Sequence, residues 1–408
     1  MLNKKNLKIF IIAGEVSGDV LGAKIMREMP NAEFFGVGGE NMQSAGLKTI
    51  FPISDLAVMG FFEVLAHAKT LTTRIDETAN AIIKSKPDVV LTVDAPGFAK
   101  RVIKKVRTKN PKSKIKFYHV VAPQVWAWGA KRAKKFAKIF DRLYCFFDFE
   151  VPFFTRYGLP TIAVGHPIAD GLIQITKKKE KITKKDKNIA LIPGSRMSEV
   201  KKLLPVFHSV VNQLTAKKKF TRYWDGIRFV ENPIQFKIGT DSKEYENNGF
   251  KFVIPVTETT DKFIRNEIKN WAIKPQLISF QNRYKTFEKT DIAIAASGTV
   301  SAELAIMHIP TIVVYKMNPL TTFMARMALK IKWVSLVNIL LNKTVYPELL
   351  GNKNATPEKI ISEINKLSNP EIRNKMISDL KSADKMWRKS KMKTASRLIV
   401  KDIIKNFK

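Results

Sequence analysis

The feature that most constrains this chain is a repeated alternation between short apolar segments and longer segments with helical spacing. The first series of apolar segments is rich in Ile, Val and Phe and comprises 8–14, 33–38, 88–94, 116–123, 142–147 and 161–165. Segments such as 71–84 and 97–106 lie between them, and their apolar residues recur at helical intervals. Because strands that alternate with helices form parallel sheets, this series predicts a Rossmann-like domain over residues 1–171.

A second series follows a polar, lysine-rich stretch at 172–187 that has the character of a linker. Its apolar segments are 188–193, 251–256, 276–280, 291–296 and 310–315, again separated by helical patterns. They predict a second Rossmann-like domain over 188–340. The length of 408 residues agrees with two domains, because a single hydrophobic core stops growing well below that size.

Two stretches fall outside these series. Amphipathic patterns at 358–367, 371–387 and 394–404 predict C-terminal helices over 341–408 that close the structure. Residues 217–248 contain aromatic residues and both charges and are too long for an ordinary connection, so they predict a surface insertion.

The predicted fold class is therefore α/β, with two Rossmann-like domains facing a central cleft. In open parallel sheets, ligands bind at the carboxyl ends of the strands. Two such edges around one cleft suit a reaction that joins two sizeable substrates, although the fold alone does not determine the chemistry.

The charge of the chain indicates an anionic partner without identifying it. Lys and Arg number 71 against 36 Asp and Glu, which gives a formal net charge of +35. Nucleic acid and an anionic membrane surface are both candidates, and a compositional drift toward lysine is a third explanation. Because no recognisable nucleic-acid-binding module accompanies the lysines, no nucleic-acid partner is expected.

The chain shows no sign of secretion or of a membrane span. Its apolar stretches are shorter than a transmembrane helix requires, and its N-terminus is typical of a strand instead of a cleaved leader. We therefore expect the protein to stay in the compartment where it is made. The single cysteine, Cys145, excludes an internal disulfide and is predicted to be a buried core thiol.

In the first domain, two loops at predicted strand ends carry polar residues. The loop after the first strand contains Glu15, Ser17, Gly18 and Asp19, and it is either a substrate-facing loop or a structural glycine turn. Asp94 ends the third strand, where it could accept a proton from a sugar hydroxyl or cap the following helix.

In the second domain, small residues and an arginine mark two strand-to-helix junctions. Gly194, Ser195 and Arg196 combine free helix amides, a hydroxyl and a guanidinium, all suited to a diphosphate. At the other junction Ser297, Gly298 and Thr299 precede Glu303, whose carboxylate could bind ribose hydroxyls or compensate the helix dipole. The lack of an Asp-x-Asp pair at a strand end predicts no metal, and no cofactor is expected.

Several motifs together resemble the lipid-A-disaccharide synthase family. They occur in the order of that family over about three quarters of the chain, and they are residues 14–19, 56–65, 94–96, 123–128, 165–167, 191–196, 297–303 and 334–338. The segments Met-Gly-Phe-Phe-Glu-Val-Leu and Pro-Gln-Val-Trp-Ala-Trp distinguish the family from other sugar-nucleotide enzymes of the same architecture. The chain departs from the family at Gly97 and Gly129, where an acidic residue and an arginine are usual.

The resemblance implies a reaction and roles for particular residues. It implies inverting transfer of 2,3-diacylglucosamine from its UDP derivative to 2,3-diacylglucosamine 1-phosphate. In that reaction Asp94 matches the catalytic aspartate, Arg196 the diphosphate-binding arginine, Glu303 the ribose-binding position and Asn338 a polar residue at the edge of the cleft. Alternatives from other classes are a UDP-N-acetylglucosamine epimerase, a peptidoglycan transferase and a basic nucleic-acid-binding protein.

The resemblance also implies work at a membrane surface, because both substrates are acylated. The residues expected to form an apolar membrane patch are Met59, Phe61, Phe62, Val64 and Leu65, although a buried amphipathic helix would show the same pattern. The expected location is cytoplasmic, peripheral on the cytoplasmic face of the inner membrane. The oligomeric state does not follow from the sequence.

Overall fold

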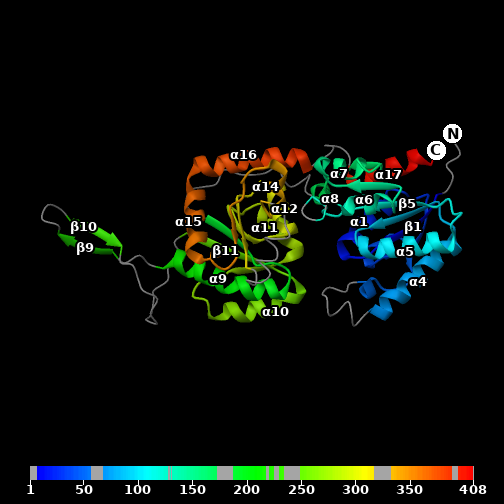
Figure 1. The fold of residues 1–408 in the computed structure, drawn as a ribbon. Helices are drawn as coiled ribbons and strands as arrows, with labels where there is room; N and C mark the ends of the chain where they lie inside the picture. Colours follow the sequence, from blue (N-terminus) through cyan, green and yellow to red (C-terminus); the bar gives the residue numbers. More distant parts are fainter. Residues whose placement is uncertain are drawn as a thin grey trace. The chain divides into compact units, whose positions relative to one another are not determined.

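The computed structural model divides the chain into two compact units (Figure 1). Unit 1 comprises Met1–Gly171 with Met386–Lys408, and unit 2 comprises Leu172–Lys385. The structure describes residues 7–56, 68–126, 129, 131–171, 187–216, 220–224, 229–233, 249–316, 332–387 and 394–407. Each unit is a parallel α/β domain, which confirms the predicted class.

Unit 1 contains a seven-stranded parallel sheet in the order β3-β2-β1-β4-β5-β6-β7. Its strands are β1 (Lys8–Ala13), β2 (Glu33–Val37), β3 (Lys48–Thr49), β4 (Val89–Val93), β5 (Lys116–Val120), β6 (Arg142–Cys145) and β7 (Thr161–Ala163). Its α-helices are α1 (Val16–Arg27), α2 (Glu40–Ser44), α4 (Ala68–Ser85), α5 (Pro96–Lys109), α6 (Arg132–Ala137), α7 (Val151–Thr155), α8 (Pro167–Gly171) and α17 (Ala395–Asn406).

Strand β1 shows why the apolar runs are continuous. Ile9 and Ile11 face a core that includes α1 and α17, whereas Phe10 and Ile12 face a second core that includes α4 and α5. Successive side chains of a strand point to opposite faces, so a sheet covered on both faces needs apolar residues at every position. Cys145 is buried in the second core, as predicted.

Unit 2 contains a six-stranded parallel sheet in the order β12-β11-β8-β13-β14-β15. Its strands are β8 (Lys187–Ile192), β11 (Phe250–Val256), β12 (Gln276–Ser279), β13 (Ile292–Ala296), β14 (Thr311–Tyr315) and β15 (Glu348–Leu350). Its helices are α9 (Met197–Thr215), α10 (Glu258–Glu267), α11 (Arg283–Phe287), α12 (Thr299–Ile306), α14 (Leu336–Leu341), α15 (Pro357–Ser368) and most of α16 (Pro370–Trp387).

The predicted insertion contains an antiparallel pair, β9 (Phe220–Trp224) with β10 (Phe229–Pro233), which forms a separate two-stranded sheet. Among the described helices, none combines the length and apolarity needed to cross a membrane.

The helices predicted over 341–408 are present, and they pack on both units. Helix α15 packs on α9 in unit 2, whereas α17 packs on α1 in unit 1. The α17 residues Ala395, Ile399 and Ile403 are buried in the core of unit 1, and Asp402 accepts hydrogen bonds from Arg142 Nη2 and Tyr144 Oη, both at 2.8 Å. The amphipathic pattern predicted these helices but did not identify the sheet that each one covers.

Candidate active site

If the strands of each parallel sheet are renumbered from 1 in chain order, both sheets have the order 3-2-1-4-5-6. The sheet of unit 1 has one more strand, β7, at its edge. The order reverses between β1 and β4 in unit 1, and between β8 and β13 in unit 2. Ligands of open parallel sheets bind beside such a reversal, outside the carboxyl ends of the strands. The four loops that the sequence singled out follow these four strands.

In unit 1 the loops after β1 and β4 are in close contact. A Cβ atom added at Gly14 would lie 2.2 Å from the Cβ of Ala95, and one added at Gly18 would lie 2.8 Å from the carbonyl oxygen of Val93. Only glycine permits this approach, so Gly14 in the first loop and Gly18 in the first turn of α1 are needed to place them against the second loop.

Asp94 begins a strained turn. Asp94 has φ 60° and Ala95 has φ 45°, and a left-handed conformation costs a residue other than glycine roughly 1–2 kcal/mol. Val121, directly after β5, has φ 80°, which is a third outlier at the same edge of the sheet. Backbone strain of this kind gathers at functional sites, where the surrounding structure holds it in place.

The Asp94 carboxylate is partly exposed and has two hydrogen-bond donors. Its Oδ1 accepts from the backbone N–H of Ala95 at 2.8 Å, and its Oδ2 accepts from Ser17 Oγ at 3.3 Å. The N-cap of α5 is Ala95, one residue later, so the structure does not support the alternative in which Asp94 caps that helix. Ser17, in the first turn of α1, and Asp94 are thus brought together.

The remaining residues of the first loop divide into exposed and structural ones. Glu15 is exposed, whereas Gly18 and Asp19 are buried. The Asp19 carboxylate accepts hydrogen bonds from the backbone N–H groups of Gly39, Asn41 and Met42 at 2.8, 3.0 and 3.0 Å. Asp19 therefore fixes the start of α2 and is unsuited to direct substrate contact in this conformation.

In unit 2 the first predicted junction lies directly after β8. Gly194 has φ 108°, and an added Cβ would lie 2.3 Å from Glu199 Oε2, so glycine is required there. Ser195 is exposed, and Arg196 is the N-cap residue of α9. The Arg196 side chain is 65% exposed, and its Nη1 lies 3.6 Å from Glu199 Oε1. Such a pair is weak in water, which leaves the guanidinium available to an anion.

The second junction of unit 2 lies beside the first. Strands β8 and β13 pair in parallel, with Ile192 opposite Ala295, so the loops after both strands start at the same edge. Gly298 is the N-cap of α12 and both it and Thr299 are exposed, whereas Ser297 is partly buried. The amides at the starts of α9 and α12 form an edge suited to phosphate groups.

Glu303 lies within α12 and is buried in a charged network. Its Oε2 accepts from Arg283 Nε at 2.7 Å, and its Oε1 accepts from Arg283 Nη2 at 2.8 Å and from Tyr284 Oη at 3.0 Å. Burial would lower the pKa of Arg283, but the bonds to Glu303 outweigh it and the pKa is raised. Sequence reasoning missed Arg283 and Tyr284, although both lie within four residues of the end of a predicted strand at 276–280.

Asn338 does not have the predicted position at a ligand-accessible edge. Its side chain is fully buried. The Oδ1 atom accepts from the backbone N–H groups of Val345 and Tyr346, and Nδ2 donates to the Tyr346 carbonyl and to Glu348 Oε1, at 2.7–2.9 Å. These four bonds use the full hydrogen-bonding capacity of the amide, so Asn338 joins α14 to β15 and contacts no ligand as folded.

Some predicted features lie outside the described residues, namely the apolar patch of Met59, Phe61, Phe62, Val64 and Leu65, and Trp128 at the end of the Pro-Gln-Val-Trp-Ala-Trp segment. Trp126 is partly buried and packs edge-on against Phe149 at 5.5 Å between ring centroids. Within the described ranges, no group of three or more His, Cys, Asp or Glu side chains is placed to hold a metal ion.

Comparisons with known proteins agree with this arrangement. The family model described as lipid-A-disaccharide synthetase matches residues 9–223 and 225–401. A lipid-A-disaccharide synthase from Gluconobacter oxydans is 36% identical over 375 residues, which cover 89% of this chain and 82% of the relative.

Two solved structures show the same fold at low identity. A UDP-GlcNAc 2-epimerase from Neisseria meningitidis, bound to UDP-GlcNAc, matches with a TM-score of 0.56 and 14% identity, covering 98% of this chain and 100% of its own. A calicheamicin glycosyltransferase matches with a TM-score of 0.57 and 9% identity, over 98% and 97% of the two chains. The family match extends through both units and includes all four loops, so this chain belongs to the lipid-A-disaccharide synthase family of glycosyltransferases.

Proposed function

We propose that the enzyme condenses UDP-2,3-diacylglucosamine with 2,3-diacylglucosamine 1-phosphate, with inversion at the anomeric carbon. The products are the lipid A disaccharide 1-phosphate and UDP. The observation that carries the proposal is the partly exposed Asp94 carboxylate, which a strained turn presents at the strand-order reversal of unit 1.

Asp94 acts as the general base. As the 6-hydroxyl oxygen of the acceptor forms its bond to the anomeric carbon of the donor, its proton passes to the Asp94 carboxylate. The bond between the anomeric carbon and the diphosphate breaks on the opposite face, and UDP leaves with that electron pair. The hydrogen bond from Ser17 keeps the Asp94 carboxylate oriented during this proton transfer.

Unit 2 binds the donor. Arg196 and Ser195, with the amides at the start of α9, hold the diphosphate together with Ser297, Gly298 and Thr299 at the start of α12. These groups oppose the negative charge that grows on the leaving diphosphate. A carboxylate has about four lone-pair positions, and Glu303 gives three of its own to Arg283 and Tyr284, so one position remains for a ribose hydroxyl that reaches this buried carboxylate.

The enzyme works at an anionic membrane surface, on the cytoplasmic face of the inner membrane. Acylated substrates reside in a bilayer, and the net charge of +35 attracts the chain to anionic lipids. We assign the contact with the acyl region to Met59, Phe61, Phe62, Val64 and Leu65, and acceptor binding to unit 1.

The products distinguish this reaction from epimerisation or transfer of an unacylated sugar. Purified enzyme is incubated with both acylated sugars in detergent micelles, and separately with UDP-N-acetylglucosamine alone, and the products are identified by mass spectrometry. We expect UDP and disaccharide in equal amounts from the first mixture and unchanged UDP-N-acetylglucosamine in the second. Epimerised sugar nucleotide, or no disaccharide from a folded enzyme, would refute the proposed reaction.

A further inference from the structure

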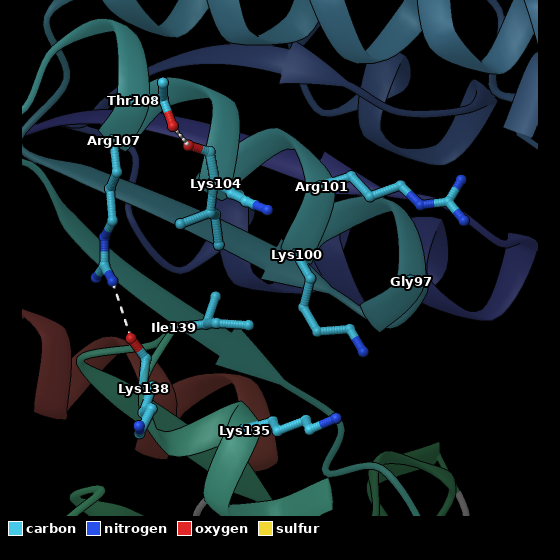
Figure 2. Close-up of a pocket in the computed structure, with 10 residues that line it drawn as sticks. Gly97, Lys100, Arg101, Lys104, Arg107, Thr108, Lys135, Lys138 and Ile139 are labelled. Carbon is cyan, nitrogen blue, oxygen red and sulfur yellow. Dashed lines mark hydrogen bonds between the residues drawn. The ribbon is translucent and has the colours of Figure 1, made fainter.

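A cationic cavity of about 660 Å³ lies between α5 and the segment that contains α6 (Figure 2). Six basic residues line it: Lys100, Arg101, Lys104 and Arg107 from α5, and Lys135 and Lys138 from the facing segment. No Asp or Glu is among its lining residues. The cavity is distinct from the loops described above, although Gly97, at its edge, follows Asp94 by only three residues.

Helical spacing explains how the cavity forms. Gly97, Lys100, Arg101 and Lys104 recur at intervals of three and four, so they share one face of α5. The opposite face of that helix is buried in the core through residues such as Val102. The amines of Lys100 and Lys135 extend from their two helices into the space between them (Figure 2).

The positive charge of the cavity is largely uncompensated by the protein. The basic residues of α5 that point elsewhere do have partners, since Lys105 and Lys109 both pair with Asp76. Arg107, at the far end of the cavity, lies 3.9 Å from Asp141 Oδ2 and donates to the Lys138 carbonyl. The other five cations of the cavity form no ion pair with any described residue.

Electrostatic crowding at Lys100 agrees with this geometry. Burial, together with the charges of Arg132, Arg101 and Lys135, lowers the pKa of Lys100. Like charges held this close raise the free energy of the folded protein, and a bound anion would offset that cost. The unpaired cluster is therefore suited to a ligand that brings negative charge.

The cavity also offers apolar surface. Ile139 is partly exposed and contributes to its wall, and the methylene stems of the lysines add to it, whereas Ile103 is buried. No aromatic side chain is among its lining residues, whereas sites for single-stranded nucleic acid combine cations with aromatic stacking platforms. A phosphate group attached to a carbon skeleton fits both parts of this wall.

We propose that the cavity binds a lipid-linked phosphate, with the phosphate beside Lys100 and Lys135 and the adjoining carbon skeleton against Ile139 and the methylene stems of the lysines. The inference rests on the proposed function in one respect, that the enzyme acts on lipids. The phosphate belongs either to the acceptor glycolipid or to an anionic phospholipid of the bilayer, and the same variants distinguish these sources.

The test compares two variants that lose the same charge. The cavity variant carries Lys100→Gln, Lys135→Gln and Lys138→Gln, and the control variant carries Lys48→Gln, Lys84→Gln and Lys112→Gln, three exposed residues of unit 1 away from the cavity. Because the cavity variant removes repulsion, its melting temperature should equal or exceed that of the wild type, which shows that it folds.

Binding to phosphatidylcholine vesicles with and without phosphatidylglycerol is measured by sedimentation, and the acceptor KM is measured in detergent micelles. If the ligand is a bilayer phospholipid, the cavity variant binds anionic vesicles about a hundredfold more weakly, the control variant loses less than about tenfold, and the acceptor KM stays unchanged. If the ligand is the acceptor, the cavity variant alone raises the acceptor KM by about tenfold or more.

Equal behaviour of the two variants in both measurements would overturn the cavity proposal. A wild-type enzyme that forms no disaccharide would refute the proposed function instead, and the vesicle measurement would still decide whether the cavity binds phospholipid.

Discussion

At the scale of single residues, the structure separates polar groups that stay partly exposed from those that complete the fold. Asp94 and Asp19 are both carboxylates near the carboxyl end of the unit 1 sheet. Asp19 is buried and uses its oxygens on the backbone at the start of α2, whereas Asp94 is partly exposed with a single side-chain donor, Ser17. The number of internal hydrogen bonds, which a sequence does not display, distinguishes the two.

Glu150 is a buried carboxylate outside the proposed site that makes the stability of unit 1 depend on pH. Its Oε2 accepts from the backbone N–H groups of Phe146 and Phe147, at 3.1 and 3.0 Å, and burial raises its pKa from 4.5 to about 7. Between pH 4.5 and about 7, Glu150 is mostly ionised in the unfolded chain and mostly protonated in the folded protein, so the folded state binds more protons. The free energy of unfolding therefore falls as the pH rises from 4.5 to about 7.

We predict that Glu150→Gln removes this dependence, because the glutamine amide is neutral and its oxygen can accept the same two bonds. The stability gained over the wild type should be small near pH 5 and should approach roughly 3 kcal/mol near pH 8. Thermal unfolding of the wild type and of Glu150→Gln between pH 5 and pH 8 checks this prediction. Glu33→Gln, at an exposed glutamate, is the control. A difference between variant and wild type that is the same at both pH values would contradict the assignment.

At the scale of elements, the candidate active-site edge of unit 1 depends on two loops that touch. Gly14→Ala places a methyl group 2.2 Å from the rigid Cβ of Ala95, so the loops after β1 and β4 must separate. Displacing a catalytic group by about 1 Å costs on the order of a hundredfold in rate, and we predict a loss of that size.

Gly97→Ala is the matched control, because it makes the same chemical change three residues after Asp94. An added Cβ at Gly97 meets no atom within 4 Å, and its φ is not positive. Its turnover at saturating acceptor should stay within about threefold of the wild type, because a methyl group at the edge of the cavity would alter acceptor affinity and leave Asp94 in place. Turnover of Gly14→Ala equal to that of Gly97→Ala would show that the contact between the loops does not position Asp94.

The sequence predicted the elements with long apolar runs and missed those without them. The predicted segments 8–14 and 88–94 became β1 and β4, but the edge strands β3 and β15 are two and three residues long and carry no apolar run. The four site loops were found because glycine and small residues at strand ends reflect local backbone demands. The burial of Asn338 and the pairing of Arg283 with Glu303 depend on residues distant along the chain, so no local pattern predicted them.

At the scale of the whole molecule, two units with the same strand order each present one strand-order reversal. Unit 1 holds Asp94 there, and unit 2 holds Arg196 beside the starts of α9 and α12. The central claim of the proposed function is that the two units have different roles in the reaction. Unit 1 supplies the base, and unit 2 binds UDP.

UDP affinity and turnover, measured in the wild type and in two single variants, test that division. In Arg196→Ala the loss of a charge-assisted hydrogen bond should weaken UDP binding by about ten- to a hundredfold. Asn tolerates the left-handed conformation of position 94 as well as Asp does, so Asp94→Asn should fold normally and bind UDP like the wild type.

The turnover of Asp94→Asn is the decisive value. Without a base of sufficient strength, this variant should form disaccharide about a hundredfold to ten-thousandfold more slowly at saturating substrates. A folded Asp94→Asn enzyme with native UDP affinity and near-native turnover would contradict the central claim, because the proton of the acceptor hydroxyl would then leave by another route.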